Sequence, residues 1–178
     1  MNPFFIYSLP RSGTAWLSVF LTAFDSYCYH EPLADMTIEH LALKFSARPD
    51  WVTGAVDTSA YQYGSMVKKA LPHARQFVLR RSVDEITASS ALCGVAYDAA
   101  TEVGALANVT QGLPVIDYHQ LRNVWYLKDL WAELIGTPFD RERAELFVEM
   151  NVQRDVRTFF ANRPHLQVNP LARRVACH

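Results

Sequence analysis

The residues best suited to chemistry follow an apolar run at the start of the chain. Phe4-Phe5-Ile6-Tyr7 precedes Pro10-Arg11-Ser12-Gly13-Thr14-Ala15, and Trp16-Leu17 then begins a pattern typical of a helix. Where a loop enters a helix in this way, the unpaired N–H groups of the first turn can collect phosphate or sulfate oxygens. Gly13 would let the backbone approach such an anion closely, and Arg11 would add a fixed positive charge. The stretch therefore predicts an anion-binding loop.

This loop differs from the nucleotide loop of ordinary ATPases and GTPases. That loop needs two glycines and a Gly-Lys-Ser/Thr ending, whereas residues 8–16 contain a single glycine and no lysine. A P-loop kinase of a small molecule is therefore a less favoured alternative, for which Asp117 is the nearest candidate magnesium ligand.

A second candidate pair lies further along the chain. Arg81 follows the apolar run at 76–80, and Ser89 comes eight positions later, about two turns into the next predicted helix. An arginine at a strand end and a hydroxyl on the following helix can both face an anion beside the sheet edge. Because side chains alternate along a strand, Arg80 and Arg81 point to opposite sides, and only one of them should reach a ligand.

Strand and helix patterns alternate along the chain. The predicted strands are the opening apolar run, 26–30, 54–58, 76–80 and 113–118, and the predicted helices are 16–24, 36–47, 61–71, 82–92, 95–110, 121–135, 140–150 and 151–163, before an irregular tail at 164–178. This order predicts an α/β fold of three layers, in which helices cover both faces of a central parallel sheet of about four or five strands. Ligands gather at the carboxyl ends of such strands, where both candidate anion sites fall.

Composition limits the class of protein. The 178 residues are enough for a single domain, 1–178, and half of them are hydrophobic, which indicates a globular chain. A net charge of −1 gives no general attraction to nucleic acid or membrane. Cys28, Cys93 and Cys177 form no close pair, so we expect neither a disulfide framework nor a zinc site. With no signal-peptide or transmembrane pattern, the expected location is the cytoplasm.

Two of these motifs resemble those of the sulfotransferase superfamily, whose domains have a P-loop NTPase-like fold. The stretch 10–14 followed by Trp16-Leu17 resembles its 5′-phosphosulfate loop, and the stretch from Arg81 to Ser89 resembles its 3′-phosphate site without the usual Asn/Asp-Pro after the arginine. A weaker likeness is the late strand at 115–121, followed by a helix that ends in Gly136. The resemblance covers roughly residues 3–150 and suggests a small soluble member.

The resemblance implies a cofactor, 3′-phosphoadenosine 5′-phosphosulfate (PAPS), and transfer of its sulfuryl group to a hydroxyl or amine acceptor. It implies no metal. The acceptor would be a small molecule, a peptide or a carbohydrate. The cofactor-binding residues would be Pro10, Arg11, Ser12, Gly13, Thr14, Ala15, Arg81 and Ser89.

The general base has three candidates at predicted strand ends. Several branches of the superfamily place an acidic residue before a proline after the second strand, and Glu31-Pro32 is similar to that pair. We therefore prefer Glu31 to His30, with Asp57 third, and assign charge stabilisation in the reaction to Arg11.

A catalytically degenerate member that binds a nucleotide or a partner is the main alternative. Family domains are usually longer, and their late basic segment has only Arg173-Arg174 as a counterpart here. A short chain also predicts an open acceptor site or one that a second subunit completes in a homodimer.

Overall fold

A computed structural model gives the structure of this chain and describes residues 2–136 and 138–150. The predicted helix at 151–163, the tail at 164–178, Cys177 and Arg173-Arg174 lie outside these residues. The strands are β1 (Phe4–Tyr7), β2 (Ser26–His30), β3 (Val52–Asp57), β4 (Arg75–Arg80) and β5 (Val115–Asp117). The α-helices are α1 (Thr14–Phe20), α2 (Ile38–Ser46), α3 (Gly64–Ala70), α4 (Val83–Leu92), α5 (Ala99–Val109), α6 (Val124–Leu134) and α7 (Arg141–Glu149). Short 3₁₀ helices lie at η1 (Pro32–Ala34), η2 (Ala60–Tyr63) and η3 (Tyr118–Arg122).

The strands form one parallel sheet of five in the order β2-β3-β1-β4-β5, which confirms the predicted parallel α/β arrangement. From β1 the chain crosses to β2 on one side, and from β4 it crosses to β5 on the other. The carboxyl ends of β1 and β4 therefore flank a topological switch point, the usual place for a ligand in an open parallel sheet. Both predicted anion motifs start at these two strand ends.

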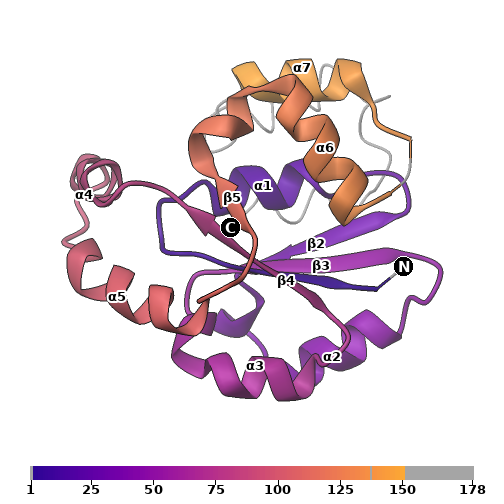
Figure 1. Cartoon of the computed structure of the whole chain (residues 1–178), viewed down its shortest axis with the longest axis horizontal. Coiled ribbons are helices and arrows are strands. Elements are labelled where there is room, and N and C mark those ends of the chain that lie inside the picture. The colour runs from indigo at the N-terminus through magenta and orange to yellow at the C-terminus, as the bar shows by residue number, and fades with distance from the viewer. Residues whose placement is uncertain (1, 137, 151–178) are drawn as a thin grey trace.

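Alternating side chains of β1 divide the core into two clusters. Phe4 and Ile6 pack with residues of α1, α6 and α7, whereas Phe5 and Tyr7 pack with residues of α2, α3 and α5. Figure 1 shows α1, α6 and α7 on one side of the sheet and α2 and α3 on the other. This arrangement confirms the predicted three layers.

The first helix is shorter than predicted, and a distant arginine binds the carbonyl groups at its end. The expected helix runs to about Phe24, but α1 stops at Phe20. The guanidinium of Arg143 is buried, and its Nη2 donates to the carbonyl oxygens of Val19 at 2.9 Å and Thr22 at 3.2 Å. A side chain from α7 thus caps carbonyl groups at the end of α1, and the Val19 carbonyl also accepts the N–H of Thr22.

Side-chain caps set several other boundaries. The side chains of Ser82, Asp98 and Asp140 accept hydrogen bonds from backbone N–H groups at the starts of α4, α5 and α7. The prediction of a helix from 121 is wrong by a few residues, because Asn123 caps α6 and the preceding turn is 3₁₀. Gly136 has a φ of 72° just after α6, as predicted for a helix-ending glycine.

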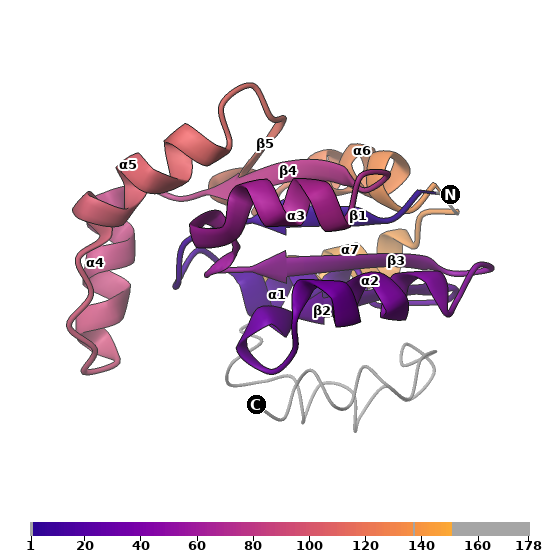
Figure 2. The ribbon, with the colours of Figure 1, turned by 90° about the horizontal axis from the view of Figure 1, so that it is seen from below.

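The helix α4 stands beyond the carboxyl ends of the strands rather than over a face of the sheet (Figure 2). This position places Ser89 at the edge where the loop after β1 lies. Within the described part of the chain, none of the helices combines the length and apolar character that a membrane crossing requires.

Candidate functional site

A cavity of about 910 Å³ opens at the carboxyl edge of the sheet. Its walls come from the loop after β1, the first turn of α1, the end of β2, the start and middle of α4, η3 and the last turn of α7. The lining residues are Pro10, Arg11, Gly13, Thr14, Ala15, Trp16, His30, Glu31, Arg81, Ser89, Tyr118, Leu121, Arg122, Val148, Glu149 and Met150. The structure therefore brings together nine of the residues singled out above, from three separate segments.

The loop after β1 holds two residues in the left-handed region. Gly13 has a φ of 88°, and Arg11, which carries a side chain, has a φ of 65°. A non-glycine residue in this region costs conformational free energy, and contacts with the surrounding structure must offset that cost. Here Arg81 supplies such a contact, because Nη1 of Arg81 donates to the carbonyl oxygen of Arg11 at 2.7 Å.

Arg11 joins the two predicted anion sites through its side chain. Its Nε donates to Oγ of Ser89 at 3.1 Å. The loop of the first motif and the helix of the second are thus connected by a backbone bond and a side-chain bond. Neither contact is visible in the sequence, because the segments lie far apart along the chain.

Arg81, rather than Arg80, reaches the cavity. Arg80 is exposed and is absent from the lining, whereas Arg81 is largely covered. The guanidinium of Arg81 lies 4.1 Å from the centre of the Tyr118 ring, and its Nη2 is 3.7 Å from Oε1 of Glu85. Nε of Arg81 is buried with no hydrogen-bond partner among the described residues, which leaves one donor for an anion to satisfy.

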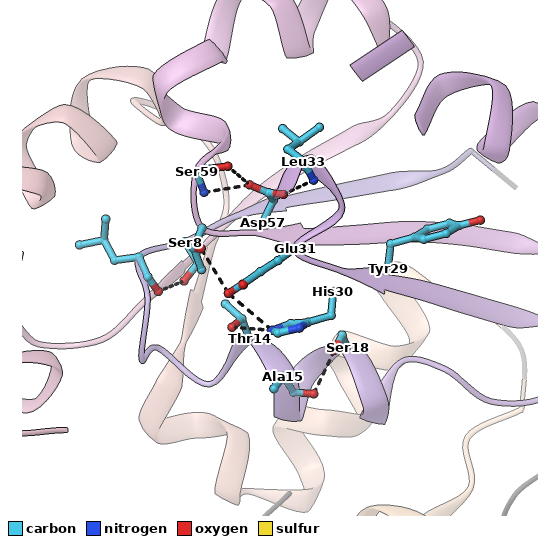
Figure 3. Close-up of polar contacts among 12 residues, drawn as sticks. Ser8, Thr14, Ala15, Ser18, Tyr29, His30, Glu31, Leu33, Asp57 and Ser59 are labelled. Carbon is cyan, nitrogen blue, oxygen red and sulfur yellow. Dashed lines mark hydrogen bonds and ion pairs between the residues drawn. The ribbon is translucent and has the colours of Figure 1, made fainter. Parts of the chain in front are cut away.

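The base candidates form a second cluster across the loop. Oγ1 of Thr14 and Nε2 of His30 are 3.2 Å apart, and Oε1 of Glu31 is 3.6 Å from the same nitrogen (Figure 3). The hydroxyl of Thr58 also donates to Oε1 of Glu31, at 3.2 Å. Glu31 itself has a φ of 46°, so the turn after β2 holds a second strained residue at the cavity.

The surroundings of His30 favour the neutral form of its imidazole. Burial lowers the pKa of its imidazole below the ordinary value, and the negative charges of Glu31 and Asp57 oppose that effect without overcoming it. A neutral imidazole has one ring nitrogen free to accept a proton, which a protonated imidazole lacks. His30 and the more exposed Glu31 thus lie side by side in the cavity wall.

Asp57, the third candidate base, does not line the cavity. Its side chain is buried, and its Oδ2 accepts the N–H of Leu33 at 2.9 Å. Its Oδ1 accepts both the N–H and the hydroxyl of Ser59, each at 2.8 Å (Figure 3). The carboxylate thus joins the turn after β2 to the turn after β3, and it supports the segment that carries Glu31.

Ser12 is also placed apart from the other loop residues. Its side chain is buried and is not part of the lining, and its Oγ has no hydrogen-bond partner within the described residues. Ser12 is therefore the one predicted cofactor-binding residue that the structure leaves out of the cavity wall.

Sequence reasoning missed several lining residues. Tyr118 and Arg122 follow β5. Their position just after a strand that ends at this edge of the sheet is the sequence signal that could have identified them. Val148, Glu149 and Met150 end α7, and no local pattern marks that turn as part of a site. In the described residues no group of three or more His, Cys, Asp or Glu side chains is arranged to hold a metal ion.

Two comparisons with known proteins gave no match. A scan against protein-family models finds no match to the chain, and a search of curated proteins finds none either.

Proposed function

We propose that the cavity binds PAPS and that the protein transfers its sulfuryl group to a hydroxyl or amine acceptor. The observation that carries this proposal is the meeting of the two anion motifs: Arg11 bonds to Ser89, and Arg81 bonds to the backbone of Arg11. Two motifs that resemble the 5′ and 3′ sites of one nucleotide thus line the same cavity.

The charges of the lining support a ligand with separated anionic groups. Arg11, Arg81 and Arg122 all line the cavity, and guanidinium groups bind phosphate and sulfate oxygens through paired donors. The unsatisfied Nε of Arg81 fits such an anion. Trp16 is also part of the wall.

The proton chemistry falls to the residues after β2. When bound, PAPS supplies the sulfuryl group. Neutral His30 accepts the proton that the acceptor hydroxyl must lose, and the carboxylate of Glu31 stabilises the imidazolium that forms. Arg11 would hold the phosphosulfate group at the loop, where its fixed positive charge can stabilise negative charge. His30 thus has the direct role and Glu31 the supporting one, the reverse of the order that the sequence favoured.

Calorimetry with 3′-phosphoadenosine 5′-phosphate, the product nucleotide, tests the cofactor site. Without magnesium we expect a dissociation constant on the order of micromolar, and Arg11→Ala should weaken binding roughly 30-fold, about 2 kcal/mol. Arg80→Ala is the matched control, because Arg80 is exposed and lies outside the lining. No binding by the wild-type chain would overturn the proposal, as would tighter binding of ATP that depends on magnesium.

Transfer itself is tested separately from binding. Radiolabelled PAPS is incubated with the protein and a panel of phenols, sugars and tyrosine peptides, and label in the acceptor is measured. We expect His30→Asn to abolish transfer while nucleotide binding remains. Nucleotide binding without transfer to any acceptor would instead identify a degenerate member that binds but does not catalyse.

A further inference from the structure

Tyr118 occupies a central position behind the anion-binding loop. It is the first residue of η3, directly after β5, and its half-buried side chain lines the cavity. Asp117 fixes this turn, because its Oδ1 accepts the N–H of His119 at 2.8 Å and its own N–H donates to the hydroxyl of Tyr126 at 3.2 Å. The ring of Tyr118 is therefore held by the end of the sheet and by the start of α6.

The edge of the Tyr118 ring lies against Gly13. A Cβ atom placed on Gly13 would lie 2.9 Å from Cε2 of Tyr118 and 3.1 Å from Cδ2. Carbon atoms this close overlap, so the ring fills the space that any side chain at position 13 would need. Direct contact with the ring, together with a φ of 88°, explains why this position is a glycine.

The face of the same ring lies against Arg81. The guanidinium carbon is 4.1 Å from the ring centre, a cation–π contact. Nη1 of this guanidinium donates to the carbonyl oxygen of Arg11, the second left-handed residue of the loop. Tyr118 thus contacts Gly13 directly and Arg11 through Arg81, and these are the two residues of the loop that have a positive φ.

We propose that Tyr118 is a positioning residue that holds the loop at 10–14 in its anion-binding shape through its ring alone. The inference rests on the proposed function for the identity of the bound anion, whereas the effect of the ring on the loop is independent of any ligand.

Two substitutions separate the ring from the hydroxyl. Tyr118→Phe keeps the ring and Tyr118→Leu removes it. Hydrogen exchange is then followed at the amides of residues 11–17, including Leu17, whose N–H donates to the carbonyl of Gly13 at 2.9 Å. We expect Tyr118→Leu to speed exchange there by roughly tenfold, while Tyr118→Phe stays within about twofold of wild type. The amides of β3 are the internal control and should be unchanged by both substitutions.

Binding of 3′-phosphoadenosine 5′-phosphate gives the functional arm. Tyr118→Leu should weaken binding by roughly tenfold or more and Tyr118→Phe by about twofold at most. Equal loop exchange in Tyr118→Leu and wild type would overturn the inference, as would faster exchange in β3 to the same extent as in the loop. If the wild-type chain bound no nucleotide, the proposed function would fail while the exchange experiment still decided the role of Tyr118.

A double substitution tests contact between the ring and Gly13 by a second measurement, thermal stability. Gly13→Ala introduces a Cβ atom that overlaps the Tyr118 ring. In a Tyr118→Ala background the ring is absent, so the overlap does not occur. We therefore expect Gly13→Ala to lower Tm by a smaller amount in that background than in wild type. An equal shift in the two backgrounds would contradict contact between the ring and the loop.

Discussion

Nη1 of Arg81 donates a hydrogen bond of 2.7 Å to the carbonyl oxygen of Arg11, across 70 positions of the sequence. The bond links the segment after β4 to the loop after β1 at a residue whose φ is 65°. Arg81 was expected to bind a 3′-phosphate with its guanidinium. In the structure one arm of that guanidinium supports the loop, while its Nε remains a buried donor without a hydrogen-bond partner in the described part of the chain.

Arg81→Lys should weaken nucleotide binding although it keeps the positive charge. An ammonium group cannot both donate to the Arg11 carbonyl and present a second, coplanar donor while stacked on Tyr118. We expect a loss of roughly tenfold in affinity for 3′-phosphoadenosine 5′-phosphate, measured by calorimetry. Arg80→Lys should leave affinity unchanged. Full affinity in Arg81→Lys would show that charge alone is sufficient at this position.

Gly13→Ala should destabilise the protein by more than backbone strain explains. Gly112 is the matched control, because its φ of 78° is similar and a Cβ there would meet nothing within 4 Å. We expect about 1 kcal/mol of lost unfolding free energy for Gly112→Ala and about 2–4 kcal/mol for Gly13→Ala, by urea unfolding. Equal losses of unfolding free energy in the two variants would show that overlap with the Tyr118 ring adds nothing to the cost of Gly13→Ala.

The titration of His30 should reveal its burial. Since burial lowers the pKa of His30, its NMR midpoint in the folded protein should lie below that of the same histidine in the urea-unfolded chain. The Glu31 charge raises this pKa, so Glu31→Gln should move the midpoint lower still. The unfolded chain binds more protons between the two pKa values, and this group therefore lowers stability as pH falls through that window. A midpoint above the unfolded value would contradict the assignment of a neutral base.

Asp57→Asn should destabilise the turn that carries Glu31. An amide nitrogen in place of either carboxylate oxygen cannot accept the N–H groups of Leu33 or Ser59. We expect a loss of about 1–3 kcal/mol in unfolding free energy. Asp35→Asn, an exposed change at the end of the same turn, should cost less than about 0.5 kcal/mol. A near-neutral Asp57→Asn variant would exclude the proposed link between the two turns.

Arg143→Met should shorten or loosen α1. Burial lowers the pKa of Arg143 to about 10, so the guanidinium is still charged at pH 7 while it binds the carbonyls of Val19 and Thr22. Removing it leaves these buried acceptors without that donor, and we expect a cost of about 2–4 kcal/mol by urea unfolding. Arg141→Met, at an exposed ion pair in the same helix, should cost less than about 1 kcal/mol. Similar costs for the two variants would contradict a role for Arg143 at the end of α1.

Local patterns were sufficient for much of the fold. The apolar runs and the alternation of strands and helices predicted the parallel sheet and its three layers. Ser82, Asp98 and Asp140 bond to backbone groups only a few residues away, so the starts of their helices depend on neighbours in sequence. The same locality explains why Gly136 marked the end of α6 correctly.

The sequence by itself determined which strand ends carry arginine, hydroxyl, histidine and carboxylate side chains, because strand direction and alternation place them on one edge of the sheet. Only the tertiary structure decided how these side chains are used. The end of α1 depends on Arg143, the carboxylate of Asp57 is taken by Leu33, and Arg81 bonds to Arg11 beside Tyr118. Each of these contacts joins segments distant in the chain, and its geometry is set by packing rather than by any local preference.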